Sequence, residues 1–422
     1  MKSISVIEKN ESSLLSQHWA DKFAQRILLK LLSNIQTGHL TLEDEGNVYS
    51  FGEPLEKADL VAHISVTHSA FYRQVLFGGS IGAGEAYMFK SWWSPDLVQV
   101  IRLMAINMPV LQQLDSKWSS LFNIACRITH KLRPNTIAKA RENISAHYDL
   151  GNSFFSLFLD KTMLYSAAIY PHENASLEEA SFYKMAHICK RLKLAEQDHL
   201  LEIGTGWGGM AIFAAKNSGC KVTSVTISQE QFSYATEWVK REGLENKVTI
   251  LLQDYRLVEG TYDKLLSIEM IEAVGHEFYS EYFSKCSKLL KPDGIMLIQA
   301  ITIQDQRFEY ARKNTDFIQQ YIFPGGCLPS NSIVAKHISQ DTDMQIVGLE
   351  DITQDYARTL RDWRKTFFAK IDNVKAQGFD DIFIRMWDFY LCYCEGGFAE
   401  RAISTVQYVF AKPNARHLPE VN

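Results

Sequence analysis

The stretch LLEIGTGWGG, residues 200–209, decides the fold. Its glycines Gly204, Gly206 and Gly209 match G-x-G-x-x-G, a tight turn that lets a cofactor approach the backbone. The turn follows HLLEIG (199–204), a short apolar run that is typical of a buried strand. Similar runs recur between helix-like segments: KVTSVTI (221–227), KVTILLQD (247–254), YDKLLSIEM (262–270) and GIMLIQAIT (294–302). This alternation predicts an α/β domain with a mainly parallel sheet and places the glycine turn at a strand's carboxyl end, where such sheets bind ligands.

The residues around the glycines favour S-adenosylmethionine over NAD. A dinucleotide site also needs an acid roughly 20 residues further on, at the end of the second strand. That strand ends in VTIS (225–228), which has no carboxylate. Glu202 precedes Gly204 by two residues, where a carboxylate could oppose a sulfonium or ammonium group, and Asp254 could meet the adenine amino group. NAD and a tight turn without any ligand remain the alternatives at this point.

Composition limits the class of protein. The chain has 422 residues, of which 46% are apolar and 22% charged, and its net charge of −5 argues against bulk nucleic-acid binding. We find no apolar run of about 18 residues that would span a membrane, and no signal peptide at the start. Seven cysteines without framework spacing fit a reducing cytosol, and the twelve histidines show no metal-binding spacing, so no metal site is predicted.

The chain divides into unequal parts. Residues 1–115 combine short helices with strand-like runs such as HLTLEDEGNVYSFG (39–52) and predict a smaller mixed N-terminal domain. Residues 116–141 contain no acid and six cations, so we predict a basic connecting segment that either attracts anionic lipid or is a solvated linker. Residues 142–422 form the larger, predicted α/β domain. The six cations are Lys117, Arg127, Lys131, Arg133, Lys139 and Arg141.

Eight stretches in a fixed order give a more specific signal. They are HYDLGNSFFSLFLDKTMLYSAAIY (147–170), LLEIGTGWGG (200–209), VTISQEQ (225–231), IEMIEAVGHEFYSEYF (268–283), KLLKPDGIMLIQAIT (288–302), YIFPGGCLPS (321–330), DYARTLRDW (355–363) and FYLCYCEGGF (389–398). In this order the chain resembles the cyclopropane-fatty-acyl-phospholipid synthases, which are relatives of the mycolic acid methyltransferases. The resemblance is dense over residues 140–412 and weaker through GGSIGAGEAYMFKSWWSPDL (78–97).

The resemblance implies a class I, Rossmann-like methyltransferase domain over residues 142–422 and an N-terminal domain over residues 1–115 that is associated with lipid or membrane. It also implies a reaction. The methyl group of S-adenosylmethionine would be transferred to the C=C bond of an unsaturated phospholipid acyl chain, and a cyclopropane ring would form. The alternatives are a sister enzyme that installs a methyl or methylene branch, a methyltransferase of a soluble small molecule, and a non-catalytic lipid-binding protein. The expected location is cytoplasmic and peripheral, at the inner face of the membrane, with a homodimer possible.

The resemblance also implies the residues that contact the cofactor. His147 is expected either to order a lid over the cofactor or to be a structural histidine. The implied contacts are Tyr165, Ser166, Glu202, Gly204, Gly206, Thr226, Ile227, Gln231, Tyr255 and Ile268.

A bound bicarbonate ion is the proton acceptor of the resembling family. Its cage corresponds here to Ala167, Glu272, Gln299, the backbone of Ile301, and Tyr356. Ala167 and Gln299 stand where the family usually has a cysteine and a histidine. An alanine side chain donates nothing and a glutamine cannot be cationic, so these departures weaken the case for bicarbonate.

Two residues near the C-terminus complete the candidate catalytic set. Cys394 matches the family's catalytic cysteine, but the chemistry does not require its attack, so we interpret it as a thiol that lines the pocket. Glu395 follows directly. We hypothesise that its carboxylate replaces bicarbonate as a built-in base beside Glu272, with hydrogen bonds from Tyr356 and Gln299. The alternative is that Glu395 points to solvent.

Overall fold

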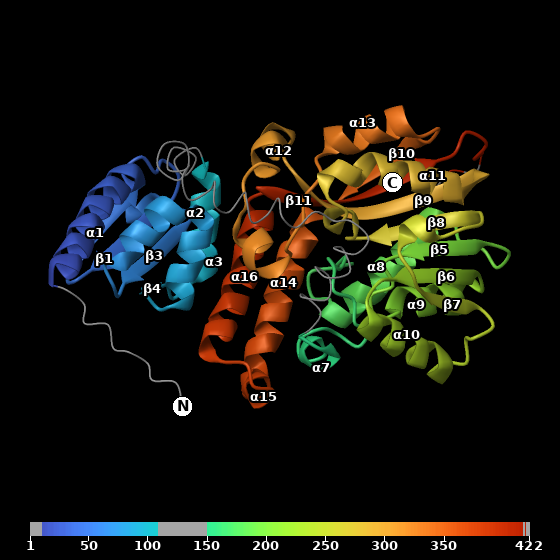
Figure 1. Ribbon diagram of the computed structural model, residues 1–422, viewed down its shortest axis with the longest axis horizontal. Helices are drawn as coiled ribbons and strands as arrows, with labels where there is room; N and C mark the ends of the chain where they lie inside the picture. Colours follow the sequence, from blue (N-terminus) through green and yellow to red (C-terminus); the bar gives the residue numbers. More distant parts are fainter. Residues whose placement is uncertain (1–10, 109–149, 417, 419–422) are drawn as a thin grey trace. The chain divides into compact units, whose positions relative to one another are not determined.

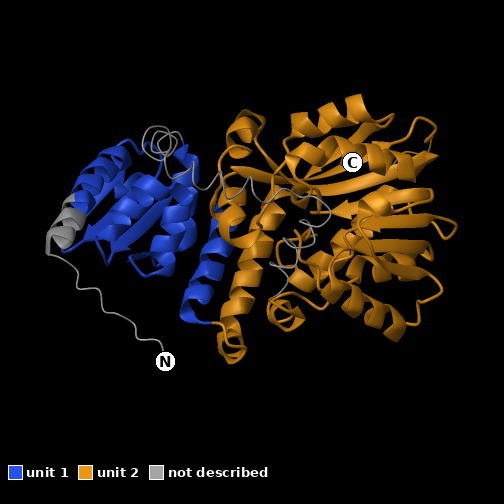
Figure 2. Cartoon of the chain, viewed as in Figure 1, with its two compact units in different colours: residues 1–126, 380–396 blue, residues 127–379, 397–422 orange. Residues whose placement is uncertain are grey.

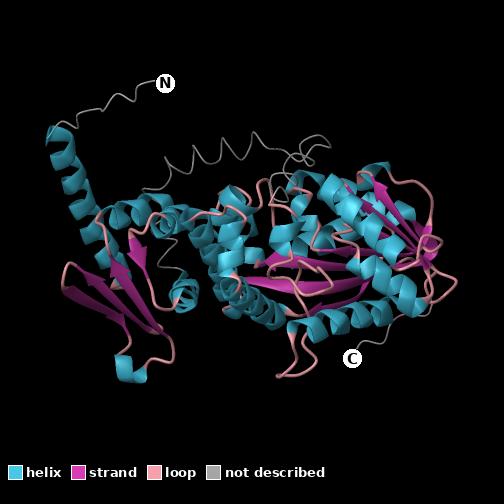
Figure 3. Ribbon diagram, turned by 90° about the horizontal axis from the view of Figure 1, so that it is seen from below, coloured by secondary structure: helices cyan, strands magenta, loops and turns pink. Residues whose placement is uncertain are grey.

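The computed structural model describes residues 11–108, 150–416 and 418, in two compact units (Figure 2). Unit 1 comprises residues 1–126 and 380–396, and unit 2 comprises residues 127–379 and 397–422. Each unit has its own sheet, drawn in magenta in Figure 3. The predicted basic segment and His147 lie outside the described residues.

Unit 1 is built around a mixed sheet of four strands in the order β2-β1-β3-β4. Strand β1 is antiparallel to β2 and parallel to β3, and the run at 39–52 forms the β1–β2 hairpin. The smaller mixed sheet that the sequence predicts is therefore confirmed. Its elements are α1 (Glu11–Leu32), β1 (His39–Asp44), β2 (Asn47–Gly52), η1 (Leu55–Lys57), β3 (Val61–Val66), α2 (Ala70–Met88), β4 (Trp92–Trp93), α3 (Leu97–Ile106) and α16 (Asp381–Ala399) up to Gly396.

Helix α16 joins unit 1 through specific contacts, although the sequence prediction assigned it to the 142–422 domain. The Tyr87 hydroxyl donates a hydrogen bond of 2.7 Å to the Asp388 carboxylate. The Arg385 guanidinium lies 3.9 Å from the centre of the Tyr87 ring. A Cβ atom at Gly396 would lie 2.7 Å from Ile101 Cγ2, so α16 approaches α3 too closely there for a larger residue. The N-terminal unit is thus assembled from two segments distant in sequence.

Unit 2 contains a sheet of seven strands in the order β10-β11-β9-β8-β5-β6-β7 (Figure 1). Its strands are β5 (His199–Ile203), β6 (Lys221–Thr226), β7 (Val248–Leu252), β8 (Tyr262–Ile268), β9 (Leu290–Ile303), β10 (Gln345–Asp351) and β11 (Ile403–Ala411). Its helices are α7 (Asn152–Phe155), α8 (Leu177–Leu192), α9 (Gly209–Ser218), α10 (Gln229–Arg241), η2 (Tyr255–Leu257), η3 (Ile271–Ala273), η4 (His276–Phe278), α11 (Tyr279–Leu289), α12 (Asp305–Ala311), η5 (Ile318–Ile322), α13 (Asn331–Asp341), α14 (Thr353–Ala369) and α15 (Ile371–Ala376).

The strand directions place the switch point of this sheet beside the glycine turn. Strands β7, β6, β5, β8 and β9 are parallel neighbours, whereas β11 is antiparallel to both β9 and β10. From β5 the chain builds outward through β6 and β7, then returns to β8 on the other side of β5. Open α/β sheets bind ligands at such a reversal, outside the carboxyl ends of the strands. The predicted mainly parallel α/β sheet is confirmed.

Both faces of the sheet are buried, which explains the apolar runs in its strands. Leu201 and Ile203 face a core that includes Tyr282 and Phe283 of α11, while their neighbour Leu200 faces a second core with Ile188 of α8. Figure 1 shows α8, α9 and α10 on one side of the sheet, and α11 and α13 on the other. With both faces covered, the strand ends are where polar side chains can meet a ligand.

Candidate active site

The glycine turn after β5 leaves its backbone open. Gly204 has φ +99°, which other residues rarely adopt, and its N–H donates to the Val225 carbonyl at 3.0 Å. A Cβ atom at Gly206 would meet nothing within 4 Å, so there is open space beside the turn. At Gly209 a Cβ atom would lie 2.2 Å from the Thr162 carbonyl oxygen. The turn therefore combines tight packing on one side with room for a ligand on the other.

Glu202 supports the turn from inside the sheet. Its side chain is buried, and burial raises the pKa of its carboxyl group to about 8. The Ser224 hydroxyl donates to this carboxyl group and lies 2.8 Å from the Thr205 hydroxyl, within the turn. The link from β5 through β6 to the turn holds the loop in place. The contact of Glu202 with a cofactor cation stays a prediction.

The end of β6 brings two predicted cofactor residues together. The Thr226 hydroxyl donates to Gln231 Oε1 at 2.8 Å and accepts the Ser228 N–H at 3.1 Å. Ser228 in turn caps α10 by accepting the Gln231 N–H at 3.3 Å. Ile227 lies between them and is half-buried. This strand end therefore presents neutral hydrogen-bonding groups where a dinucleotide site would have its acid.

The end of β7 departs from the prediction for Asp254. Its two carboxylate oxygens accept hydrogen bonds of 2.8 Å from the Arg256 guanidinium, so its charge is matched by Arg256 and not held ready for adenine. The neighbouring Tyr255 ring packs edge-on against Tyr282 at 5.4 Å. Its hydroxyl is buried and has no hydrogen-bond partner among the described residues. An orphaned donor of this kind fits a ligand in the same place. Ile268, the last residue of β8, is half-buried.

The segment before α8 places Tyr165 and Ser166 beside a buried lysine. The Tyr165 ring lies 5.1 Å from both the Phe155 and Trp363 rings. Ser166 Oγ accepts a hydrogen bond of 2.6 Å from Lys184 Nζ. Lys184 is 0% exposed, and burial lowers the pKa of its ammonium to about 8. A charge this deeply buried needs an anionic neighbour.

Three groups that the sequence assigned to an anion cage surround the carboxylate of Glu269. Its Oε1 accepts hydrogen bonds from the Ala167 N–H at 2.9 Å and from Gln299 Nε2 at 2.8 Å. Its Oε2 accepts one of 2.8 Å from the Tyr356 hydroxyl. Burial raises the pKa of Glu269, while Lys184 and these donors oppose the rise. The cage therefore contains a carboxylate that the chain itself provides.

A second glutamine fixes the direction of the Gln299 amide. Gln407 Nε2, opposite it on β11, donates to Gln299 Oε1 at 2.9 Å. Because the oxygen is engaged by Gln407, Gln299 presents its N–H₂ group to Glu269. Both glutamines are 0% exposed, so water does not compete for these bonds.

Glu269 has an unusual backbone for its residue type. Its φ is +48°, in the left-handed region, which costs a residue other than glycine about 1–2 kcal/mol. Its N–H donates to the Gln299 carbonyl at 2.7 Å, directly beyond the β8–β9 ladder. Main chain and side chain are thus both held by Gln299, and these bonds offset the backbone cost.

Glu272, three residues after Glu269, differs from it in hydrogen bonding and in protonation. Its Oε1 accepts the Ile301 N–H, and its Oε2 is buried without a hydrogen-bond partner among the described residues. Burial and the Glu269 charge raise the pKa of Glu272 to about 8. Lys184 and three donors favour the charge on Glu269, so this pair carries its negative charge there and Glu272 holds a proton at neutral pH.

The hypothesis for Glu395 needs correction. Tyr356 and Gln299, its expected donors, are bonded to Glu269 instead, because β8 ends directly beside them. Glu395 is 3% exposed and so does not point to solvent, and Cys394 beside it is half-buried. Both belong to α16 in unit 1. Ala167, whose side chain donates nothing, donates to Glu269 through its backbone N–H.

Comparison with known proteins decides the family. The family model of mycolic acid cyclopropane synthetase matches residues 135–408. This chain belongs to that family. The resemblance seen in the sequence is thereby confirmed. The protein is an S-adenosylmethionine-dependent methyltransferase.

Similar proteins include both ring-forming and other lipid methyltransferases. The tuberculostearic acid methyltransferase UfaA1 of Mycobacterium tuberculosis is 37% identical over 86% of this chain and 87% of its own length. The cyclopropane-fatty-acyl-phospholipid synthase of Escherichia coli K12 is 37% identical over 83% and 88%. A crystal structure of the mycolic acid cyclopropane synthase CmaA1 complexed with SAH and CTAB has 30% identity and a TM-score of 0.60, covering 64% of this chain and 98% of that one.

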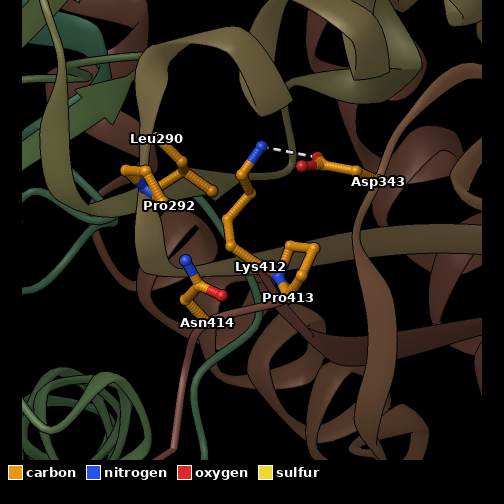
Figure 4. A pocket seen from close by; sticks show the side chains of 6 residues that line it. All are labelled: Leu290, Pro292, Asp343, Lys412, Pro413 and Asn414. Carbon is orange, nitrogen blue, oxygen red and sulfur yellow. Dashed lines mark hydrogen bonds and ion pairs between the residues drawn. The ribbon is translucent and has the colours of Figure 1, made fainter.

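A small pocket of the protein lies away from the Glu269 and Glu272 carboxyl groups (Figure 4). It is lined by Leu290, Pro292, Asp343, Lys412, Pro413 and Asn414. Leu290 begins β9 opposite Tyr262, the first residue of β8, so the pocket is at the amino end of the parallel strands. Lys412 is already bonded to Asp343 and to the Ser287 carbonyl. This pocket is therefore not the methyl-transfer site.

Among residues 11–108, 150–416 and 418, which the structure describes, no helix has the length and apolar character needed to cross a membrane. Over the same ranges, no three or more His, Cys, Asp or Glu side chains are grouped as a metal site would require.

We expect Glu272→Gln to reduce the loss of stability as the pH rises. In the folded protein the Glu272 carboxyl group has a pKa of about 8, above the ordinary 4.5, so the folded state binds this proton more tightly than the unfolded state does. The stabilisation is complete below pH 4.5 and is lost as the pH rises through 8. Glutamine keeps the acceptor for the Ile301 N–H and does not titrate. The melting temperature of the wild type should therefore fall more than that of the variant between pH 5 and 8.5, by ~3 °C or more.

The matched control is Glu309→Gln, whose side chain is 62% exposed and ion-paired on the surface. Its melting temperature should follow that of the wild type over the same pH range. Parallel curves for the wild type and Glu272→Gln would contradict the assignment of a protonated Glu272.

Proposed function

We propose that this protein transfers the methyl group of S-adenosylmethionine to the C=C bond of an unsaturated phospholipid acyl chain and closes a cyclopropane ring. The observation that carries the proposal is the meeting of two features at the switch point of the sheet. The open glycine turn follows β5, and a buried carboxylate that accepts hydrogen bonds follows β8, the neighbouring strand.

The cofactor, when bound, supplies a strongly electrophilic methyl group on a sulfonium. An isolated C=C bond is a weak nucleophile, and its attack leaves a positive charge on the acyl chain. The aromatic rings of Tyr165, Trp363 and Tyr356 form a continuous series, with Trp363 5.1 Å from Tyr165 and 6.2 Å from Tyr356. Their faces can stabilise such a charge, and the burial of Trp363 and Tyr356 excludes water that would trap it. A proton must then leave the new methyl group.

A methyl or methylene branch is the second candidate product. The tuberculostearic acid methyltransferase relative, 37% identical over most of this chain, favours it. Ring closure and methylene formation share the methyl transfer and the loss of one proton. They differ only in where the remaining C–H electron pair goes.

The test is incubation with vesicles of a monounsaturated phospholipid and S-adenosylmethionine carrying a trideuterated methyl group. The expected product is a lipid that retains two of the deuterium atoms in a ring, which fragmentation and proton NMR distinguish from a methylene branch of equal mass. Vesicles of the saturated phospholipid are the control. Cofactor binding without any lipid product would contradict the proposal and favour a lipid-binding protein or a soluble acceptor.

We also propose that the protein binds the membrane surface through residues 116–141. Each cation near an anionic surface contributes roughly 1 kcal/mol, so six of them can hold a chain of net charge −5 on anionic vesicles. Co-sedimentation with such vesicles should weaken with added salt and when the six cations are changed to glutamine. Lys240→Gln with Arg241→Gln, at the exposed end of α10, is the control that should not change it. Salt-independent binding would contradict this role. Light scattering on the same preparation tests the expected homodimer.

A further inference from the structure

Contacts on both sides of Glu269 place it within the proposed methyl-transfer site. It follows Ile268, and the next residue, Met270, has its Cγ 3.4 Å from where a Gly204 side chain would begin. On its other side it accepts the backbone N–H of Ala167, directly after the cofactor candidates Tyr165 and Ser166. The Glu269 carboxylate is thus enclosed by two segments that are expected to hold the cofactor.

The hydrogen bonds around this carboxylate leave one position open. Oε1 accepts two hydrogen bonds, from Ala167 and Gln299, whereas Oε2 accepts one, from Tyr356. A carboxylate oxygen can accept two, so Oε2 keeps acceptor capacity with respect to the described residues. The Lys184 charge lowers the pKa of this carboxyl group and so opposes the rise that burial causes. The group is therefore oriented, charged and able to take a proton on Oε2.

We propose that Glu269 Oε2 is the base that accepts the proton lost from the transferred methyl group, an inference that rests on the proposed methyl transfer. A C–H bond of the new methyl group breaks and the proton bonds to Oε2. The C–H electron pair forms the closing ring bond or a C=C bond, which neutralises the positive chain. S-adenosylhomocysteine is the other product, and the proton passes to water when the site opens. No additional oxyanion is required.

The backbone of Glu269 makes the proposal testable by chemical rescue. Because φ is +48°, glycine suits this position better than any other residue. Glu269→Gly removes the carboxylate but keeps Ala167, Gln299, Tyr356 and Lys184 around the vacated space. A small carboxylate such as formate has the charge and shape to fill it. Glu269→Gln keeps the size of the side chain, removes the charge and leaves no such space.

The experiment compares the wild type, Glu269→Gln and Glu269→Gly in carbonate-free buffer with the deuterated cofactor and monounsaturated vesicles. A general base contributes about 10²–10⁴-fold, so both variants should lose at least about 100-fold in turnover. Their affinity for S-adenosylmethionine, measured by calorimetry, should stay within about 3-fold of the wild type, as expected when only the proton transfer is lost. Millimolar formate or bicarbonate should restore Glu269→Gly at least about 10-fold, and should change neither the wild type nor Glu269→Gln.

Formate binding gives a readout that does not depend on activity. It should raise the melting temperature of Glu269→Gly and leave that of Glu269→Gln unchanged. An active wild type with Glu269→Gln retaining near-normal turnover would overturn the role of Glu269. So would a folded Glu269→Gly that formate neither stabilises nor rescues. A wild type that forms no lipid product would instead overturn the proposed function.

Discussion

Gly204→Val should abolish S-adenosylmethionine binding, weakening it at least about 100-fold, or ~2.8 kcal/mol. The reason is local. Gly204 has φ +99°, which valine avoids, and a Cβ atom there would already lie 3.4 Å from Met270 Cγ. The two further methyl groups of valine would enter the space beside the turn. Calorimetry with the cofactor measures the loss, and NAD should show no specific binding to the wild type.

The control for backbone strain is Gly243→Val. Gly243 also has a positive φ, +64°, but it follows α10 and a Cβ atom there would meet nothing within 4 Å. This variant should bind the cofactor like the wild type. Wild-type affinity in a folded Gly204→Val protein would refute the assignment of the turn to the cofactor.

Lys184→Met should destabilise the protein by about 3 kcal/mol or more, because it leaves the buried Glu269 charge without its cation. Methionine fills a similar volume, so the loss reports on charge and on the hydrogen bond to Ser166. Glu269 should then take up a proton, which would also reduce turnover. The melting temperature, measured at neutral pH, gives the first readout.

A double variant separates charge from packing. If the cost arises from Glu269, adding Glu269→Gln to Lys184→Met should recover much of the stability, and the two changes should be strongly non-additive. Lys161→Met is the surface control. It removes an ion pair with Glu178 in which the lysine is 83% exposed, and should cost less than about 1 kcal/mol. Additive effects of Lys184→Met and Glu269→Gln would contradict a charge interaction between the two buried side chains.

The sheet of unit 2 follows from the sequence because its signals are local. Each predicted run from 199 to 302 matches an observed strand, since strands covered on both faces require apolar runs of that length, although β9 extends beyond its run at both ends. The glycine turn follows from spacing alone. The grouping of residues 380–396 with the N-terminal unit does not follow from the sequence. A helical apolar pattern shows that one face of the helix is buried, but not which partner covers it.

The sequence predicts a carboxylate beside Tyr356 and Gln299, but it names Glu395 and not Glu269. The substitutions at Ala167 and Gln299 suggested that a carboxylate of the chain replaces an external anion, and the structure finds a carboxylate there. Glu395 is the expected residue because it directly follows Cys394 and its carboxylate is an oxyanion like bicarbonate. Glu269 becomes visible only through the β8–β9 pairing and a left-handed backbone. An acid placed directly after a strand, as in SIEM, was the available signal.

The two-part construction of unit 1 has a consequence for biosynthesis. Tyr87 and its partner Asp388 are separated by 301 positions in the chain. At about 5–20 residues per second a ribosome needs roughly 15–60 s between them. Throughout that interval the emerged N-terminal segment lacks the helix that covers Tyr87 and Ile101. That apolar surface stays uncovered while all the strands of the parallel sheet are synthesised. We therefore expect a nascent-chain chaperone to bind the N-terminal segment during this interval.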